Sequence, residues 1–127
     1  MTLLVDAGPI VALLDRRQVA HERCVELMDR ASEPIVTCEA VIAEACDLLR
    51  RIDGAARDLL KDVAAGRYIV DYRLSERASS VRQLMAKYAD VPMSLADACL
   101  VDLANIHQTG RIATLDADFG VYRWDKN

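Results

Sequence analysis

Four acidic residues lie far apart in the chain, yet each belongs to a segment that should be buried. Asp6 and Asp116 end short apolar runs, whereas Glu44 and Asp97 lie in segments with helical periodicity. If the fold gathers these carboxylates, they repel one another unless a cation lies between them. Oxygen-only ligation suits Mg²⁺ or Mn²⁺, which can activate water and neutralise charge on a phosphodiester. The residue types therefore point to metal-dependent phosphoryl transfer or hydrolysis.

The first of these acids closes the apolar run 2–6, which has no polar alternation. Such a run is typical of a strand buried on both faces in the middle of a parallel sheet. Gly8-Pro9 follows, and proline suits the first position of a helix. Asp6 should then lie at the carboxyl end of a central strand, where open α/β sheets bind ligands. Asp6 could equally serve only as the cap of the following helix.

The second acid, Glu44, falls in a helix predicted over residues 39–52. At about 100° per residue, Glu44 lies at the edge of the apolar stripe and Asp47 faces nearly the opposite way. We therefore expect Glu44 to be held close to the core, and Asp47 to be solvated.

The third acid, Asp97, lies near the start of the most apolar helix, predicted over residues 94–106. Ser94-x-x-Asp97 resembles a capping box, which would explain the acid without any chemistry. Asp97 also shares a helical face with Val101, so it should point inward, and capping is compatible with metal binding. Asp102 lies about 140° away around the helix, so we expect it to be the solvated acid.

Strand and helix patterns alternate along the whole chain. We predict helices over 9–16, 20–31, 39–52, between Gly54 and Gly66, over 75–89 and over 94–106, the last stopped by Gly110, and strands over 2–6, 34–37, 68–72, 111–116 and 121–124. This alternation predicts an α/β fold with a mainly parallel sheet covered on both sides. No linker, repeat or low-complexity segment interrupts it, so residues 1–127 should form a single domain.

Composition narrows the class of protein further. Hydrophobic residues make up 53% of the chain and aromatic residues only 5%, so the core should be mainly aliphatic. No apolar run reaches membrane-spanning length and no signal peptide is evident, which predicts a cytoplasmic protein with no membrane partner. The four cysteines form no Cys-x-x-Cys pair and should be reduced core residues. A net charge of −4 argues against a general nucleic-acid binder, although bound cations would change that balance.

Four short motifs, in this order and separation, resemble the PIN-domain family, and especially its VapC-like ribonuclease toxins of bacterial toxin–antitoxin pairs. They are Val5-Asp6 before an apolar helix, Val41-Ile42-Ala43-Glu44, Ser94-Leu95-Ala96-Asp97-Ala98, and Thr114-Leu115-Asp116-Ala117-Asp118-Phe119. The resemblance covers nearly the whole chain. It implies a three-layer α/β/α sandwich with a shared acidic pocket, and a Mg²⁺- or Mn²⁺-dependent endoribonuclease.

Residue by residue, the resemblance assigns the catalytic and metal-binding acids. These are Asp6, Glu44, Asp97 and Asp116, with Asp118 as an auxiliary acid and Thr114 as a supporting hydroxyl. Asp6, Asp97 and Asp116 would hold one or two ions, whereas Glu44 would bind the metal or orient the attacking water. Ala7-Gly8 departs from the family pattern, because many members have a small hydroxyl or amide residue after the first acid.

The resemblance also implies partners: an RNA substrate, a second copy in a homodimer, and an antitoxin whose basic or apolar segment occupies the acidic groove. Two alternatives stay open from the sequence. Asp116-x-Asp118 after an earlier glutamate is also found in Toprim-like metal enzymes that act on DNA. The Ala7-Gly8 departure and the acidic net charge fit a PIN-like interaction module with weak catalysis or none.

Overall fold

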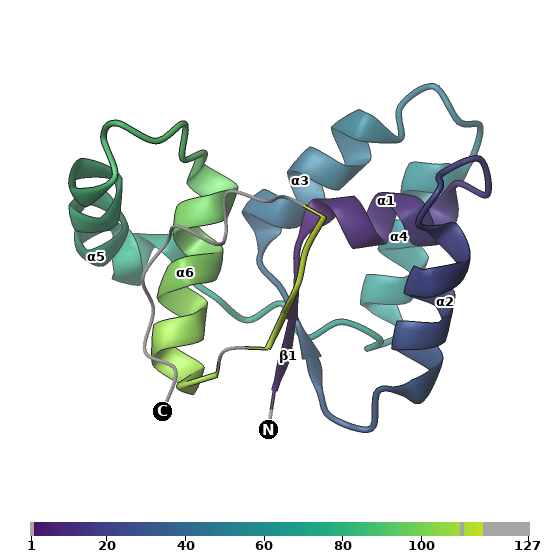
Figure 1. The fold of residues 1–127 in the computed structure, drawn as a ribbon, viewed down its shortest axis with the longest axis horizontal. Helices are drawn as coiled ribbons and strands as arrows, with labels where there is room; N and C mark the ends of the chain where they lie inside the picture. The colour runs from purple at the N-terminus through teal and green to yellow at the C-terminus, as the bar shows by residue number, and fades with distance from the viewer. Residues whose placement is uncertain (1, 110, 116–127) are drawn as a thin grey trace.

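The computed structural model describes residues 2–109 and 111–115, which fold as a parallel sheet surrounded by helices (Figure 1). Their elements are, in order, β1 (Leu3–Val5), α1 (Ala7–Leu14), α2 (His21–Arg30), β2 (Ile35–Val36), α3 (Glu39–Leu48), α4 (Ala55–Ala64), α5 (Leu74–Lys87), α6 (Leu95–His107) and β3 (Ile112–Ala113). The strand order is β2-β1-β3, with every pair parallel. The prediction that the first strand is the central one is therefore confirmed.

The register of the sheet aligns the ends of its strands. Leu4 lies opposite Val36 of β2, and Val5 lies opposite Ala113 of β3. Since all three strands run the same way, the residues that follow β1 and β3 emerge side by side at one edge. This carboxyl edge is the place where the sequence predicted the site.

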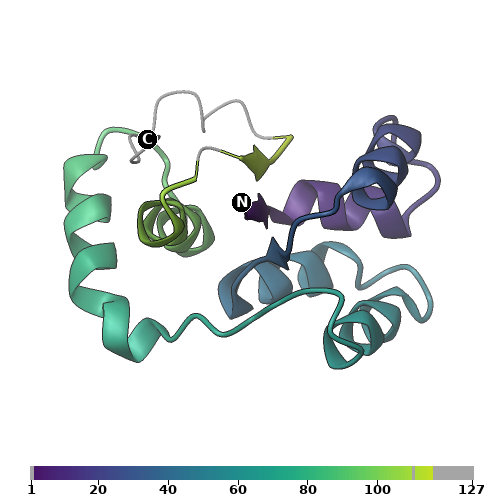
Figure 2. The same ribbon diagram turned by 90° about the horizontal axis from the view of Figure 1, so that it is seen from below.

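The helices form layers on the two faces of the sheet (Figure 2). Helices α5 and α6 lie on one side, and α1, α2 and α4 lie on the other. Helix α3 packs against both α1 and α6, so it joins the two helical groups. The predicted three-layer α/β/α architecture is confirmed.

The core is aliphatic, as the composition predicts, and it is centred on β1 and α6. Leu4 and Val5 are fully buried, and every residue of α6 from Ala96 to Ala104 is buried. Cys24, Cys38 and Cys99 are buried, Cys46 is half-buried, and all four are free thiols. No helix in the described ranges is both long enough and apolar enough to cross a bilayer.

The strand predicted over residues 68–72 does not form. Ile69 alone bridges to Val36, donating its N–H to the Ile35 carbonyl at 2.8 Å and accepting from the Thr37 N–H at 3.0 Å. Beyond it the chain leaves the sheet, and the hydroxyl of Tyr72 donates to Asp102 on α6. Burial of this segment against α6 replaces further pairing with β2.

Several helix boundaries also differ from the predictions. Helix α1 begins at Ala7 because the Asp6 carboxylate caps it, so Pro9 lies in the first turn and not at the first position. Helix α3 ends at Leu48 and not at residue 52. Helix α6 is followed by Gln108 in the left-handed conformation, at φ 50°. The predicted stop at Gly110 and the predicted strand 121–124 lie outside the described residues.

Candidate functional site

Asp6 lies at the carboxyl end of the central strand and is 5% exposed. One of its oxygens, Oδ1, accepts a hydrogen bond from the Ala7 N–H at 2.8 Å, which caps α1. The other, Oδ2, accepts from the Thr114 hydroxyl at 2.9 Å. Asp6 therefore lies at the predicted edge of the sheet and also caps α1, and its role as a ligand stays a prediction.

Two threonines hold this end of β1 in place. Thr114 follows β3 and bonds to the Asp6 carboxylate, as the family resemblance implied. Thr37 follows β2, is fully buried, and donates its hydroxyl to the Val5 carbonyl at 2.8 Å. Thr37 was not among the predicted site residues, although a hydroxyl residue directly after the apolar run of the second strand was a signal for it.

Asp97 lies at the start of α6 and is 7% exposed, so the prediction that it points inward is confirmed. The capping box is also present. The Ser94 N–H donates to Asp97 Oδ2 at 3.0 Å, and the Asp97 N–H donates to the Ser94 hydroxyl at 3.1 Å. The cap therefore fixes the rotamer of this carboxylate.

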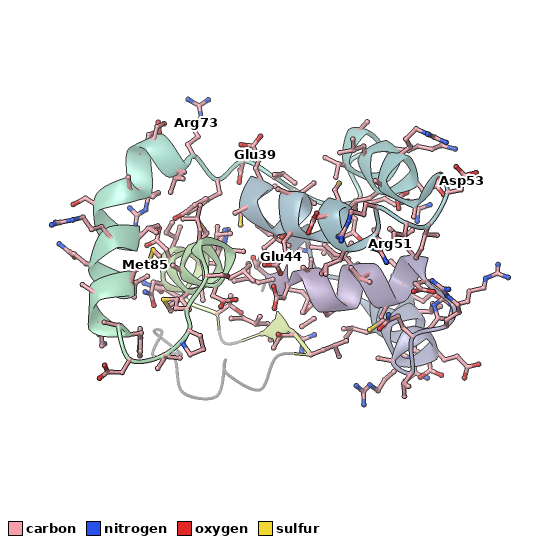
Figure 3. The ribbon with its side chains drawn as sticks, turned by 90° about the horizontal axis from the view of Figure 1, so that it is seen from above. Glu39, Glu44, Arg51, Asp53, Arg73 and Met85 are labelled. Atoms are coloured by element: carbon pink, nitrogen blue, oxygen red, sulfur yellow. The ribbon has the colours of Figure 1, made fainter. Side chains whose placement is uncertain are left out.

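The side chain of Glu44 is more exposed to solvent than predicted. It is exposed, because the buried side of α3 is formed by Val41, Ile42 and Ala45 and leaves Glu44 outside the packed core. Figure 3 shows Glu44 where α3, α1 and α6 meet, on the face above the carboxyl edge of the sheet. It contributes to the same cavity as the two buried aspartates, although it is not held close to the core. Asp47 is exposed, as predicted.

These side chains share one cavity of about 390 Å³. Its described lining consists of Asp6, Gly8, Glu44, Leu48, Ser94, Asp97 and Leu115. None of these is Lys, Arg or His, so the lining described provides acidic oxygens and no cationic side chain. This donor set fits a hard divalent cation.

A complete ligand set is not formed by the described residues alone. In residues 2–109 and 111–115, no three acidic, histidine or cysteine side chains come close enough together to hold one ion. Asp116 and Asp118, the remaining predicted ligands, lie outside the described residues. The structure thus brings three of the five predicted acids to one cavity.

The Ala7-Gly8 departure has a steric explanation. A Cβ atom at position 8 would lie 3.2 Å from Cβ of Leu115. Glycine therefore allows the segment after β3 to approach the first turn of α1 closely. A hydroxyl or amide side chain at this position would require Leu115 to shift.

Asp102, predicted to be solvated, is 2% exposed, and that prediction is wrong. Arg77 of α5 donates to both of its oxygens at 2.8 Å, and the Tyr72 hydroxyl donates at 2.7 Å. The hydrogen bonds to Asp102 raise the pKa of Arg77. Burial, and then the Asp102 hydrogen bond, raises the pKa of Tyr72. This cluster of Tyr72, Arg77 and Asp102 was not predicted from the sequence, and it joins α5 to α6 away from the cavity.

Taken together, the fold and the cavity define an α/β protein with carboxylates gathered at the carboxyl edge of a parallel sheet. A comparison with known families matches residues 3–124 to the PIN domain, and the chain belongs to the PIN domain family. This match decides against the Toprim-like alternative.

Two relatives, both from Mycobacterium tuberculosis, are similar over most of the chain. Ribonuclease VapC26 is 26% identical over 116 residues, which cover 90% of this chain and 86% of the relative. The crystal structure of VapC20, described as a sarcin-ricin loop cleaving toxin, matches with a TM-score of 0.85 at 17% identity. That match covers 98% of this chain and 99% of VapC20, and it shows that the two share a fold.

Proposed function

We propose that this protein is a metal-dependent endoribonuclease and the toxin of a type II toxin–antitoxin pair. The observation that carries the proposal is a single cavity that Asp6, Glu44 and Asp97 line without any basic side chain among the described lining residues. Membership of the PIN domain family and the similarity to a protein named as a VapC ribonuclease support the same activity. We further propose that residues 1–127 form one such domain.

The acids and the hydroxyl residues that fix them have different roles in this proposal. Asp6 and Asp97, with Asp116, would hold Mg²⁺ or Mn²⁺, and Asp118 would assist. The ion would supply charge neutralisation at the scissile phosphate and acidify a water molecule. The Thr114 hydroxyl fixes the Asp6 carboxylate, and the Ser94 N–H fixes the Asp97 carboxylate, so both would be oriented before an ion binds.

Glu44 has a different position and a different proposed role. It is exposed on the open side of the cavity, where water and RNA have access. Its carboxylate oxygens would accept a hydrogen bond from the attacking water and orient it toward the phosphorus atom. Glu44→Gln should therefore reduce cleavage more than it reduces binding of Mn²⁺.

The test is cleavage of an end-labelled RNA pool, containing structured and unstructured members, with Mn²⁺ or with EDTA. Asp6→Asn and Asp97→Asn should abolish cleavage while the circular dichroism spectrum is retained. Asp58→Asn, on the exposed side of α4, is the matched control and should cleave normally. Full activity in folded Asp6→Asn, or undiminished cleavage in EDTA, would reject the proposed mechanism.

A non-catalytic interaction module is the second candidate, favoured by the glycine that replaces a polar residue after Asp6. Titration calorimetry with Mn²⁺ separates the two candidates, because the nuclease must bind the ion and Asp6→Asn must bind it more weakly. Absence of Mn²⁺ binding, together with retained partner binding, would favour the module.

The partners are also proposals, supported by the VapC names of the two relatives. They are an RNA substrate, a cognate antitoxin that covers the acidic cavity, and a second copy of the chain in a homodimer, all in the cytoplasm. Sedimentation at several protein concentrations tests self-association, and a strictly monomeric protein would refute the dimer. Co-expression with the neighbouring reading frame tests the antitoxin.

A further inference from the structure

We infer that Leu48 and Arg51 extend the acidic cavity into a surface that positions the RNA strand, with Arg51 on a phosphate next to the scissile one. This inference rests on the proposed function and adds the residues that hold the substrate. It starts from Glu44 and Leu48, which lie at i and i+4 on one side of α3, and from Arg51, which lies three residues beyond the end of that helix. Helix α3 ends at Leu48, and the chain then continues in tight turns, in one of which the N–H of Ile52 donates to the Leu49 carbonyl at 3.0 Å.

From Glu44 to Arg51, the chain runs away from the two buried aspartates over the same face of the molecule. Figure 3 labels both Glu44 and Arg51 on the face above the carboxyl edge of the sheet, Arg51 farther along the α1–α3 junction. The four residues from Glu44 to Leu48 correspond to about 6 Å along the helix axis, and Arg51 lies three residues farther along the chain. A strand whose scissile phosphate lies among the carboxylates would therefore place a nearby phosphate at Arg51.

The positive charge of Arg51 favours binding to the phosphates of RNA. The described cavity lining is acidic, so a cationic side chain at its rim would add to the attraction that a bound metal ion exerts on a polyanion. Arg50 pairs with Asp47 at 3.4 Å, and Arg57 pairs with Asp53 at 3.9 Å. Arg51 is exposed, and no acidic side chain in the described part of the chain forms an ion pair with it. A guanidinium in this state can form two parallel hydrogen bonds with a phosphate.

Apolar surface lies between the acids and the arginine. Leu48 is 55% exposed and Leu115 is 45% exposed, although both line the acidic cavity. Single exposed leucines need no explanation, but two that border one polar cavity provide a surface for the face of a nucleobase. The nucleotide next to the scissile bond would thus contact leucine through its base and Arg51 through its phosphate.

Binding tests the arginine with a matched control. Arg82 of α5 is also exposed and has no ion pair in the described part of the chain, but α5 lies at the opposite end of the molecule from the end of α3 (Figure 1). The probe is the fluorescent RNA pool, with Ca²⁺ replacing Mn²⁺ and intact RNA verified by gel. Arg51→Ala should weaken binding about five- to tenfold and reduce the slope of log Kd against log[KCl] by about 0.7, the value for one phosphate of a single strand. Arg82→Ala should change neither quantity to this extent.

Cleavage kinetics separate positioning from chemistry. Arg51→Ala should raise KM about five- to tenfold and leave kcat within about twofold, because it removes substrate binding and no reacting group. Leu48→Ser should also raise KM, whereas Leu60→Ser, at a 52% exposed position of α4, should not.

The outcomes distinguish this inference from the proposed function. If the wild type cleaves RNA and Arg51→Ala matches Arg82→Ala in salt slope and KM, the positioning role is overturned and the nuclease stands. If the wild type neither binds nor cleaves any member of the pool, the proposed function fails, and the positioning role fails with it.

Discussion

Removing the guanidinium of Arg77 should destabilise the protein more than its partly exposed position suggests. Asp102 is 2% exposed and accepts hydrogen bonds from Arg77 Nε, Arg77 Nη2 and the Tyr72 hydroxyl. In Arg77→Met, the carboxylate would retain Tyr72 as its one hydrogen-bond donor among the described residues. A buried charge without compensation is one of the few causes of a large loss of stability.

The magnitude follows from the burial of the two partners. Breaking a fully buried ion pair costs about 3–5 kcal/mol. The Arg77 side chain is 38% exposed, so solvent screens part of the pair and we expect a loss of about 2–4 kcal/mol in the free energy of unfolding. Adding Asp102→Asn neutralises the stranded charge and keeps an acceptor for Tyr72. The double variant should therefore recover about 1–2 kcal/mol relative to Arg77→Met alone.

Urea unfolding at neutral pH, followed by circular dichroism, measures these differences. Arg82→Met is the control on the same helix and should stay within about 0.5 kcal/mol of the wild type. A loss below about 1 kcal/mol in Arg77→Met would refute the reasoning, since a stranded buried charge costs more than that. A double variant less stable than Arg77→Met would refute it equally.

Three further predictions concern separate features of the molecule. Burial raises the pKa of Tyr68 to about 12, so the folded state keeps this proton at a pH where the unfolded chain loses it. The free energy of unfolding should fall as the pH rises from about 10 to 12, and Tyr68→Phe should flatten that fall in urea titrations at each pH. Thr114→Val should lower stability by about 1 kcal/mol and reduce cleavage by releasing Asp6, whereas Thr114→Ser should retain both, in paired unfolding and cleavage assays. Gly8→Ala should leave the Tm unchanged or slightly raised, because alanine stabilises a helix by up to about 1 kcal/mol relative to glycine and the exposed Leu115 side chain can move aside. A clear fall in Tm would show that Leu115 cannot move.

The carboxyl edge of the sheet could be predicted from the sequence because residues that are close together in the chain determine it. An apolar run that ends in an acid and continues into a helix places Asp6 at the end of a buried strand, whatever the rest of the chain does. Parallel topology then brings Thr114 beside it through the register of β1 and β3. The position of Asp97 could be predicted equally well, because the residues that form its capping box and define its inward face lie within about one turn of α6.

The errors arose where distant contacts decide the structure. A helical wheel distinguishes a solvent-exposed face from a buried face only if the helix has an exposed face. Helix α6 is buried from Ala96 to Ala104, so the wheel could not identify Asp102 as exposed or buried. Arg77, which compensates Asp102, lies 25 residues earlier on another helix. The segment 68–72 has strand-forming residues, but its pairing stops after Ile69 because Tyr72 bonds across to α6.

Asp97 and Asp102 show how a structural acid differs from a candidate catalytic one on the same helix. Both are almost fully buried, at 7% and 2% exposure, so burial alone does not separate them. Asp102 faces a guanidinium that matches both of its oxygens, which satisfies its charge within the protein. Asp97 faces a cavity whose described lining adds Asp6 and Glu44 and no cationic side chain. Carboxylates that gather in one cavity repel one another, and a divalent metal ion among them would stabilise this arrangement.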